Sequence, residues 1–380
     1  MQPDADLLHY FDPVDLKEIQ TDDRILQPLL SKTHIYRPKS RNFRFRDADV
    51  VLVGIGRKGS ADDIRRHLYG LSFHLGEVKM ADLGNLRPGK TPEDTFIGIT
   101  DVVAGLGKMK KKVILIGDST RQVLPVFHGV QQLEHPVNLT VADSRIDLMP
   151  DDHYLLSHYL NPIVSDPETL LFDFVHLGYQ SYLCNPSAPE LLDQLWFDHY
   201  RLGNLREDLR ETEPVFRNTD LFACSMSSVR QPEAPGVGFP SPNGFTAEEI
   251  CQISRYAGLS DKLSVFALLD YVAEHDHLGQ TAALAAQVIW HFLQGFTQRR
   301  NDYPFTDIRE YQKYIVTLPK AGHDLCFYKS PASNRWWMEV PYPDTQYPRS
   351  LYVACSPRDY QVACDGEIPD RWWKNYQRLL

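Results

Sequence analysis

Short runs of continuous apolar residues, separated by longer amphipathic segments, constrain this chain more than any other feature. Seven runs occur, at residues 49–56, 76–84, 111–118, 137–143, 170–180, 220–227 and 262–272. Apolar runs without polar alternation are typical of strands covered on both faces. Helical patterns lie between them at 61–71, 92–106, 246–257 and 280–296. The sequence therefore predicts an α/β protein with a mostly parallel sheet and helices on both sides.

The charge balance excludes one large class of function. The 380 residues include 40 Lys and Arg against 50 Asp and Glu, a formal charge of −10. Proteins that bind nucleic acid draw most of their affinity from basic surfaces that neutralise phosphates. We therefore expect no nucleic-acid partner. The hydrophobic fraction of 43% is ordinary for a chain with a packed core.

Cysteine spacing and the N-terminus bear on the compartment. The six cysteines contain no C-x-x-C pair, which argues against a zinc or thioredoxin-type motif. The first residues are acidic and lack the basic and apolar regions of a signal peptide. No apolar run reaches the roughly 18 residues of a membrane span. We expect a cytoplasmic protein with reduced thiols and no membrane span.

The last 80 residues form an aromatic-rich C-terminal extension, 301–380. It holds fifteen aromatic residues, including Trp336, Trp337, Trp372 and Trp373. Residues 323–330 and 335–342, joined by a turn-forming segment, predict a β-hairpin. Large rings bury well, so one interpretation packs the extension onto the main domain. The other makes part of it a surface for an unknown protein partner, because Trp and Tyr are enriched in binding hot spots.

A glycine motif suggests a nucleotide site. Gly54, Gly56 and Gly59 form G-x-G-x-x-G between a predicted strand and a predicted helix. This is where a dinucleotide-binding loop would lie, with Asp82 as a candidate acidic residue for the ribose. The alternative is a tight strand-to-helix turn, which also needs small residues.

Several longer segments resemble the ureohydrolase family, which includes arginase, agmatinase and formimidoylglutamase. They are ILIGDST at 114–120, TVADSRIDL at 140–148 and ACSMSSVRQPEAPGVGFPSPNGFTAEE at 223–249, with further agreement at 56–71, 78–85 and 268–290. The formimidoylglutamase branch is the most similar. The resemblance implies a three-layer α/β/α domain with an eight-stranded, mostly parallel sheet, and makes the glycine motif a loop of that fold. It divides the chain into a lead-in at 1–47, a ureohydrolase-like domain at 48–300 and the extension, which we expect to pack on that domain.

The family hydrolyses a C–N bond with a hydroxide that bridges two Mn²⁺ ions, which carboxylates and histidines hold. The resemblance locates the ligand positions here. In the first loop Asp118 matches, but Ser119 stands in place of a ligand histidine. In the second, Asp143 and Asp147 match, while Arg145 replaces the histidine between them.

The third ligand loop departs further from the family. Ser225 and Ser227 occupy the positions of two ligand aspartates, and Asp270 corresponds to a substrate-facing glutamate. The six ligand positions are Ser119, Asp143, Arg145, Asp147, Ser225 and Ser227, and four of them therefore carry no ligand of the family type. A guanidinium at Arg145, about 4 Å from a dication, would be repelled by about 8 kcal/mol at an effective dielectric constant of roughly 20. We expect no metal pair, and we expect Arg145 to point into the old cavity and pair with Asp143 or Asp147.

Other motifs are weaker. His275 and His277 flank Asp276 and could share a metal, but in a polar loop such side chains are more often solvated.

The sequence leaves three functions open. The leading one is a ureohydrolase-fold protein that has lost its dimanganese site, uses no cofactor and serves as a binding or scaffolding protein. The second is an active formimidoylglutamase-like or arginase-like hydrolase of linear amidines with a rearranged site. The third is a nucleotide-binding protein. A homo-oligomer is also open, because the family forms trimers and hexamers.

Overall fold

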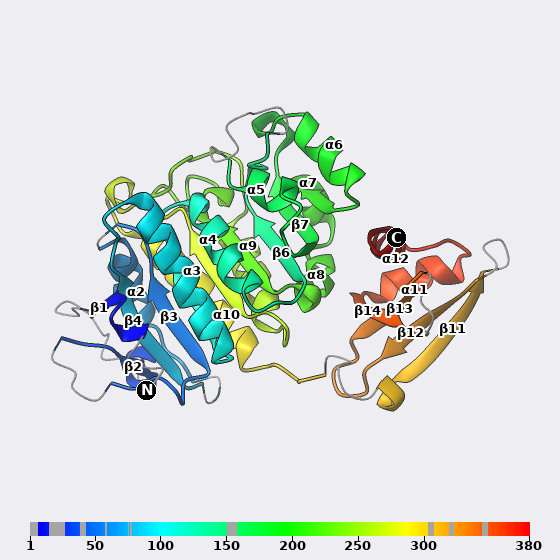
Figure 1. Cartoon of the computed structure of the whole chain (residues 1–380), viewed down its shortest axis with the longest axis horizontal. Helices are drawn as coiled ribbons and strands as arrows, with labels where there is room; N and C mark the ends of the chain where they lie inside the picture. The colour runs from blue at the N-terminus through cyan, green and yellow to red at the C-terminus, as the bar shows by residue number, and fades with distance from the viewer. Residues whose placement is uncertain are drawn as a thin grey trace.

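Eight parallel strands form the central sheet of the computed structural model, as predicted, and two short strands extend one edge (Figure 1). The structure describes residues 7–14, 27–38, 43–57, 59–74, 76, 78–149, 158–302, 308–318, 323–343 and 349–380. The eight strands lie in the order β4-β3-β5-β10-β9-β6-β7-β8. Their bounds are β3 Val50–Gly54, β4 Met80–Leu86, β5 Lys112–Ile116, β6 Val137–Ala142, β7 Leu171–Tyr179, β8 Asp198–Arg201, β9 Leu221–Ser225 and β10 Val265–Leu269.

The two additional strands come from the N-terminal lead-in. β1 (Phe11–Asp12) pairs antiparallel with β4, and β2 (Thr33–Ile35) pairs parallel with it. The ring of Phe11 is fully buried beneath this edge. Part of the lead-in therefore belongs to the sheet.

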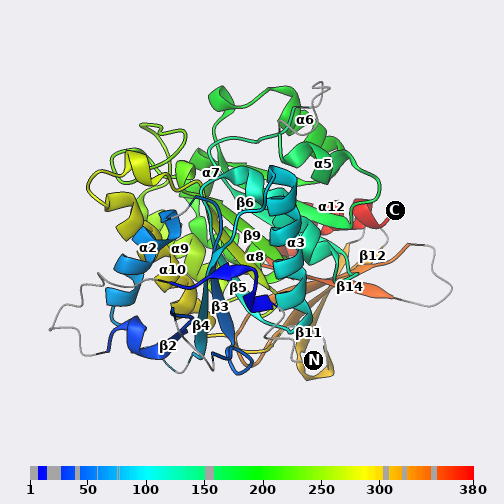
Figure 2. The ribbon, with the colours of Figure 1, turned by 60° about the vertical axis from the view of Figure 1, so that its left-hand side comes forward.

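Helices cover both faces of the sheet (Figure 2). On one face lie α3 (Pro92–Lys108), α4 (Val123–Gln131), α5 (Leu160–Ser165) and α6 (Ser187–Gln194). On the other lie α2 (Ser60–Gly70), α7 (Leu202–Glu207), α8 (Thr212–Asn218), α9 (Ala247–Gly258) and α10 (Gln280–Phe296). Short 3-10 helices are η1 Leu29–Lys32, η2 Thr120–Gln122, η3 Ser181–Leu183, η4 Leu209–Glu211, η5 Met226–Ser228, η6 Ala273–His275 and η7 Ile308–Glu310. This is the three-layer arrangement expected from the sequence.

The two helical layers explain the continuous apolar runs. Successive side chains of a strand point to opposite faces, so a strand with a core on each side needs apolar residues at every position. In β3, Val50 and Leu52 face one core, whereas Val51 and Val53 face the other. All four side chains are fully buried. Such strands leave little room for polar side chains between their ends.

A buried ion pair ties α2 to β4. Arg65 Nε and Nη2 donate to the two carboxylate oxygens of Asp82 over 2.8 and 2.9 Å. The Tyr69 hydroxyl donates to the same carboxylate, and neither Arg65 nor Asp82 is exposed to solvent. The sequence suggested Asp82 as a ribose ligand, but its carboxylate is used within the fold.

The C-terminal extension has a second sheet and its own core. The antiparallel strands β11 (Gln312–Leu318), β12 (His323–Lys329), β13 (Trp336–Pro341) and β14 (Ser350–Cys355) are followed by α11 (Pro357–Cys364) and α12 (Asp370–Leu379). The predicted hairpin is confirmed as β12 and β13. Its turn closes through Asn334, which takes a left-handed φ of 61°.

Arg217 of α8 makes a buried polar contact between the extension and the α/β domain. Its Nη1 and Nη2 donate to the carbonyls of Trp336 and Cys355, each over 2.8 Å. Its guanidinium also lies over the Trp337 ring, 4.9 Å from the centroid. Glu213 joins the contact by pairing with Arg217 and with Arg335 of the extension, over 3.0 and 3.2 Å.

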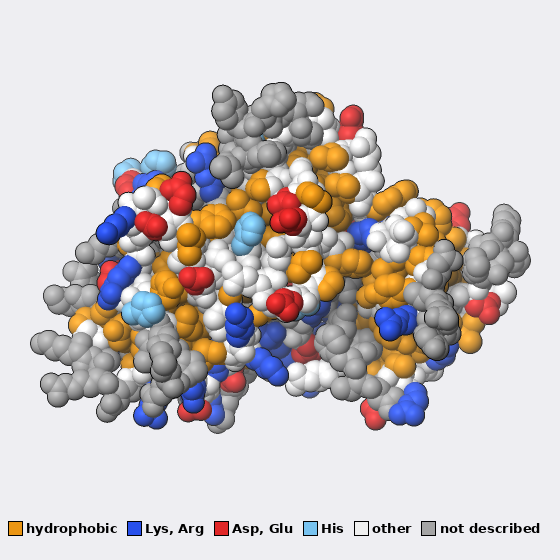
Figure 3. All heavy atoms as spheres, in the orientation of Figure 1, with side chains coloured by type: hydrophobic (Ala, Val, Ile, Leu, Met, Phe, Trp, Pro, Cys, Tyr) orange, Lys and Arg blue, Asp and Glu red, His pale blue; other side chains and the backbone are white. Residues whose placement is uncertain are grey.

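The two tryptophan pairs differ: Trp336 and Trp337 are both buried, whereas Trp372 is buried and Trp373 is exposed. Trp336 packs in the extension's own core, whereas its neighbour Trp337 faces Arg217. Trp372 is 7% exposed and Trp373 is 41% exposed. Figure 3 shows hydrophobic side chains gathered over the visible face of the extension. In the part of the chain that the structure describes, no helix is long and apolar enough to cross a bilayer.

Arg65→Met should destabilise the protein by about 3–5 kcal/mol, because it leaves the Asp82 charge buried without a cationic partner. Urea denaturation measures the loss. Arg66→Met is the matched control, since Arg66 is 45% exposed and its ion pair among the described residues is with Asp63 on the same helix. Such a pair contributes about 0–1 kcal/mol. Equal losses in the two variants would contradict a special role for the buried pair.

Arg217→Met should loosen the extension while the α/β domain stays folded, because two carbonyls would lose their donors. Native-state hydrogen exchange should become faster in β13 and β14 and remain unchanged in β3 and β5. Arg210→Met is the control, because the Arg210 side chain is 80% exposed on the neighbouring turn. Unchanged exchange in β13 and β14 would show that other contacts hold the extension.

Candidate functional site at the carboxyl ends of the central strands

Four adjacent strands, β5, β10, β9 and β6, bring the expected site residues to one edge of the sheet. The registers pair Ile116 with Leu268, Leu269 with Ser225, and Ala142 with Cys224. Ser119, Asp270, Ser225 and Asp143 therefore lie at or just beyond neighbouring strand ends. In open α/β sheets this edge is where ligands usually bind.

Protein side chains occupy the space beside Gly54 and Gly56, two of the three glycines of the motif, whereas the space beside Gly59 is open. Gly56 has a φ of 100°, and a Cβ there would lie 2.1 Å from Asp118 Oδ1. Asp118 accepts a hydrogen bond from the Arg57 N–H over 2.8 Å and another from the Gln122 amide over 2.9 Å. A Cβ on Gly54 would lie 2.0 Å from Asn85 Oδ1. Gly56 and Gly54 therefore leave room for the side chains of Asp118 and Asn85, which supports the interpretation of the motif as a structural turn.

Asp143 is the most perturbed carboxyl group at this edge. It follows β6 and is 7% exposed. Its Oδ1 accepts the Arg145 N–H over 3.3 Å. Burial, with the nearby Asp270 carboxylate as the second cause, raises the pKa of Asp143 to about 7. Asp143 can therefore exchange a proton near neutral pH.

The side chain of Arg145 does not make the expected ion pairs, so this prediction is wrong. Its guanidinium lies over the Phe239 ring, 4.3 Å from the centroid. Among the described residues, its Nε is buried without a hydrogen-bond partner. The aromatic face attracts the cation and draws it away from the two aspartates that flank it in sequence.

Asp147 is bound to the segment that begins α5. Its Oδ1 lies 2.6 Å from His158 Nδ1, and its Oδ2 accepts the Tyr159 N–H over 3.1 Å. Asp143 and Asp147 thus have separate partners, although both match the family's second ligand loop.

The serines of the third loop form a small network with Asp270. The Ser227 hydroxyl donates to Asp270 Oδ2 and accepts the Phe239 N–H over 3.3 Å. The Ser225 hydroxyl accepts the Ser227 N–H over 3.2 Å. Burial raises the pKa of Asp270, although hydrogen bonds from Ser227 and the Gly238 backbone oppose the shift. Asp270 has a left-handed φ of 66°, which turns the chain sharply after β10.

Ser119 and the His275–His277 segment have local structural contacts. The Ser119 hydroxyl accepts the Arg121 N–H over 3.3 Å. Both histidines are exposed, and His275 Nδ1 contacts the Val237 carbonyl over 2.9 Å. Asp276 between them accepts the N–H groups of Thr281 and Ala282 over 3.1 and 2.8 Å and so caps α10.

Tyr159 and His176 are buried polar residues that the sequence did not single out. In the described part of the chain, the Tyr159 hydroxyl and His176 Nδ1 have no hydrogen-bond partner. Burial, with Asp143 as the second cause, raises the pKa of Tyr159. Burial lowers the pKa of His176 to about 3, so its ring is neutral, and its Nε2 lies 2.9 Å from the Arg145 carbonyl. The sequence signal available for His176 was a lone histidine in the apolar run 170–180. The sequence offered no such signal for Tyr159.

The donor set does not fit a pair of Mn²⁺ ions. Ser227 is hydrogen-bonded to Asp270 and Asp147 to His158, and another of the six positions carries the Arg145 cation. Within the described residues, no three His, Cys, Asp or Glu side chains are grouped to hold a metal ion. The edge instead offers a carboxyl group that titrates near pH 7, two hydroxyls and a guanidinium.

Comparison with known proteins identifies the family. A model of the arginase family matches residues 55–294. Formimidoylglutamase from Staphylococcus haemolyticus is 24% identical over 254 residues, which cover 63% of this chain and 80% of that protein. The Streptococcus gordonii formimidoylglutamase is 23% identical over 281 residues, which cover 67% and 83%.

Solved structures share the fold of the α/β domain. Formiminoglutamase from Trypanosoma cruzi matches with a TM-score of 0.63 and 19% identity, over 72% of this chain and 99% of that one. Formimidoylglutamase from Bacillus subtilis gives a TM-score of 0.64 and 15% identity, over 77% and 97%. Another matching crystal structure is that of the Trypanosoma cruzi protein with Mn²⁺. The match over residues 55–294 exceeds half of the chain, which therefore belongs to the arginase family.

Proposed function

We propose that this arginase-family protein does not carry out dimanganese hydrolysis and acts instead as a binding or scaffolding protein. The observation that carries the proposal is the arrangement at the former ligand positions. Arg145 places a permanent cation at the edge where the family places metal ions, because guanidinium does not deprotonate in proteins. The serines that replace two carboxylates remove negative charge from the same edge.

Contacts among these residues support the proposal. The Ser227 hydroxyl donates a hydrogen bond to Asp270, and the Asp147 carboxylate accepts hydrogen bonds from His158 and Tyr159. A metal pair would have to displace these bonds and also tolerate Arg145. Asp143 alone, with a pKa near 7, would not offset two dications.

We place the protein partner on the extension. Trp373 is 41% exposed, whereas Trp336, Trp337 and Trp372 are at most 9% exposed. Exposed Trp is enriched in binding hot spots. The compartment we propose is the cytoplasm, which agrees with six cysteines that are all unpaired.

A second candidate is a C–N hydrolase acting on linear amidines through a rearranged site. One observation favours it: the pKa of about 7 at Asp143 suits a group that accepts a proton from water near neutral pH. Tyr159 adds a buried hydroxyl whose charge environment includes Asp143 and Asp270. We do not extend the proposal to nucleotide binding, because Asp118, Asn85 and Asp82 have other partners.

The purified protein should release no urea, formamide or ammonia from arginine, agmatine or formiminoglutamate when Mn²⁺ is added. The family reaction needs a metal that lowers the pKa of bound water, and the ligands for it are largely replaced. Turnover assays together with elemental analysis after dialysis against Mn²⁺ test this expectation. The Trypanosoma cruzi formiminoglutamase provides a positive control.

A variant with the family's ligand types restored tests the same proposal. Combining Ser119→His, Arg145→His, Ser225→Asp and Ser227→Asp restores ligand types at all four altered positions, and this variant should retain more Mn²⁺ than the unmodified chain. Activity of the unmodified chain that disappears with a chelator and returns with Mn²⁺ would overturn the proposal.

Asp143→Asn should stabilise the protein at pH 8 more than at pH 4. The ordinary pKa of Asp is 3.8 and that of Asp143 is about 7, so the folded state holds its proton more tightly than the unfolded state. Below about pH 4 the Asp143 carboxyl group does not destabilise the folded state. Its destabilising effect grows between about pH 4 and 7 and is complete above that range. Urea denaturation at both pH values measures the difference.

Asp147→Asn is the control, because this change removes a partner of His158 and should not stabilise the protein. If the effect of Asp143→Asn were identical at pH 4 and pH 8, Asp143 would not titrate near neutrality, and the observation that favours the hydrolase would be lost.

A further inference from the structure

A large cavity with mainly apolar walls lies at the amino ends of β6, β7 and β9, where these strands face the extension. This interdomain cavity has a volume of about 660 Å³. Its apolar wall is formed by Pro136 and Phe172 of the α/β domain and by Tyr342, Leu351, Tyr352, Val353 and Leu379 of the extension. Small-molecule sites are typically cavities of roughly 300–1,000 Å³ with apolar walls and a few polar groups.

The Asp and Lys side chains that line the cavity already have partners of opposite charge. Asp173 Oδ1 lies 2.7 Å from Arg378 Nη1, and Asp220 Oδ2 lies 2.9 Å from Lys262 Nζ. Asp220 also accepts the Asn138 N–H over 2.9 Å. Neither sign of charge is therefore left in excess on these walls.

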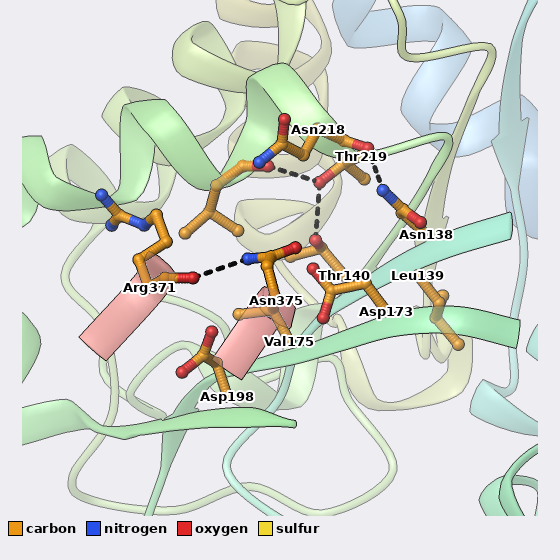
Figure 4. Close-up of a pocket in the computed structure, with 11 residues that line it drawn as sticks. Asn138, Leu139, Thr140, Asp173, Val175, Asp198, Asn218, Thr219, Arg371 and Asn375 are labelled. Carbon is orange, nitrogen blue, oxygen red and sulfur yellow. Dashed lines mark hydrogen bonds between the residues drawn. The ribbon is translucent and has the colours of Figure 1, made fainter. Parts of the chain in front are cut away.

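The other polar groups at one end of the cavity are neutral amides. Asn138, Asn218 and Asn375, together with Asp173, also line an adjoining space of about 10 Å³ (Figure 4). The dashed lines in Figure 4 include the bonds that the Asn138 and Asn375 amides donate to the carbonyls of Asn218 and Arg371, over 2.7 and 2.8 Å. A side-chain amide has two N–H donors and an oxygen with two acceptor sites, so each retains hydrogen-bonding capacity.

These walls favour a neutral ligand over an ion of either sign. An ion that leaves water loses its hydration, and it recovers that free energy only where it meets an unpaired opposite charge. His135 is the other basic residue of the wall, and its Nδ1 lies 3.0 Å from the Pro136 carbonyl, so this nitrogen is already hydrogen-bonded. A neutral hydroxyl both donates and accepts, which suits the amides, and an apolar body is stabilised by the apolar wall.

We propose that the interdomain cavity binds an uncharged small molecule with an aromatic or branched apolar body and one hydroxyl or amide group. The polar group lies at the end lined by Asn138 and Asn375. The body lies between Phe172 and the β14 residues Leu351 and Val353. The cavity is at the amino ends of the strands and the former metal edge is at their carboxyl ends, so this site goes beyond the function proposed above.

Three matched naphthalene compounds, titrated into the full chain, test the proposal because they share one body and differ in charge. Isothermal titration should show saturable binding of 2-(1-naphthyl)ethanol, which is neutral. The anion 1-naphthaleneacetate and the cation 2-(1-naphthyl)ethylammonium should each bind at least about tenfold more weakly, because neither finds an unpaired opposite charge. No saturable binding of the alcohol, or equal or tighter binding of either ion, overturns the proposal.

Two variants locate the binding. Leu351→Trp fills the apolar part of the cavity and should weaken binding of the alcohol at least about tenfold. Ile315→Trp is the control, because Ile315 is 59% exposed on β11 of the same sheet and does not line the cavity. Unchanged affinity in Leu351→Trp, or equal losses in both variants, would place the binding elsewhere and overturn the proposal. If Leu351→Trp does not fold, the three-compound comparison on the unmodified chain still decides it.

Discussion

Burial of the central strands on both faces is the constraint on which the rest of this structure depends. Most strand positions are apolar, as Val50 to Val53 illustrate, and the buried polar exceptions include Asp82 of β4 and His176 of β7. Many of the remaining charged and polar groups lie where strands end, and the two ends have separate surroundings. The carboxyl ends carry Asp143, Asp270 and the serine network, whereas the amino ends of β6, β7 and β9 face the extension across a cavity.

If the metal pair has been lost, as we propose, the carboxyl edge must balance its charges without it. Removing two dications from a cluster of carboxylates would leave strong repulsion. Here serines reduce the negative charge, burial keeps Asp143 partly protonated near neutrality, and Arg145 contributes a cation that is held by Phe239. These changes compensate one another, so none of them would be expected alone.

The sequence predicts the layers of this fold well because the signal is local. The apolar runs and helical periods lie close to the observed strands and helices, and the turn before Trp336 closes as expected. β8 was missed because its residues, Asp198–Arg201, are only partly buried at the sheet margin and carry no apolar run. The short strands β1 and β2 depend on pairing with β4, and no local sequence pattern predicts that pairing.

Side-chain partners were predicted less well because they come from distant segments. The Phe239 ring that holds Arg145 belongs to a loop more than ninety residues later, and Asp82 is taken by a residue of α2. The position of the ligand loops followed from the resemblance, but the direction of Arg145 depended on a competition between an aromatic face and two carboxylates. Sequence order does not decide such a competition.

The Arg217 contact has a mechanical consequence. α8 carries Arg217, and three residues after the helix ends the chain enters β9, which runs straight to Ser225. At about 3.3 Å per residue, β9 spans roughly 17 Å from the amino edge to the carboxyl edge. Besides the ion pairs that join the extension to Asp173 of β7 and Asp198 of β8, β9 would therefore carry a displacement of the extension at Arg217 to the carboxyl edge of the sheet.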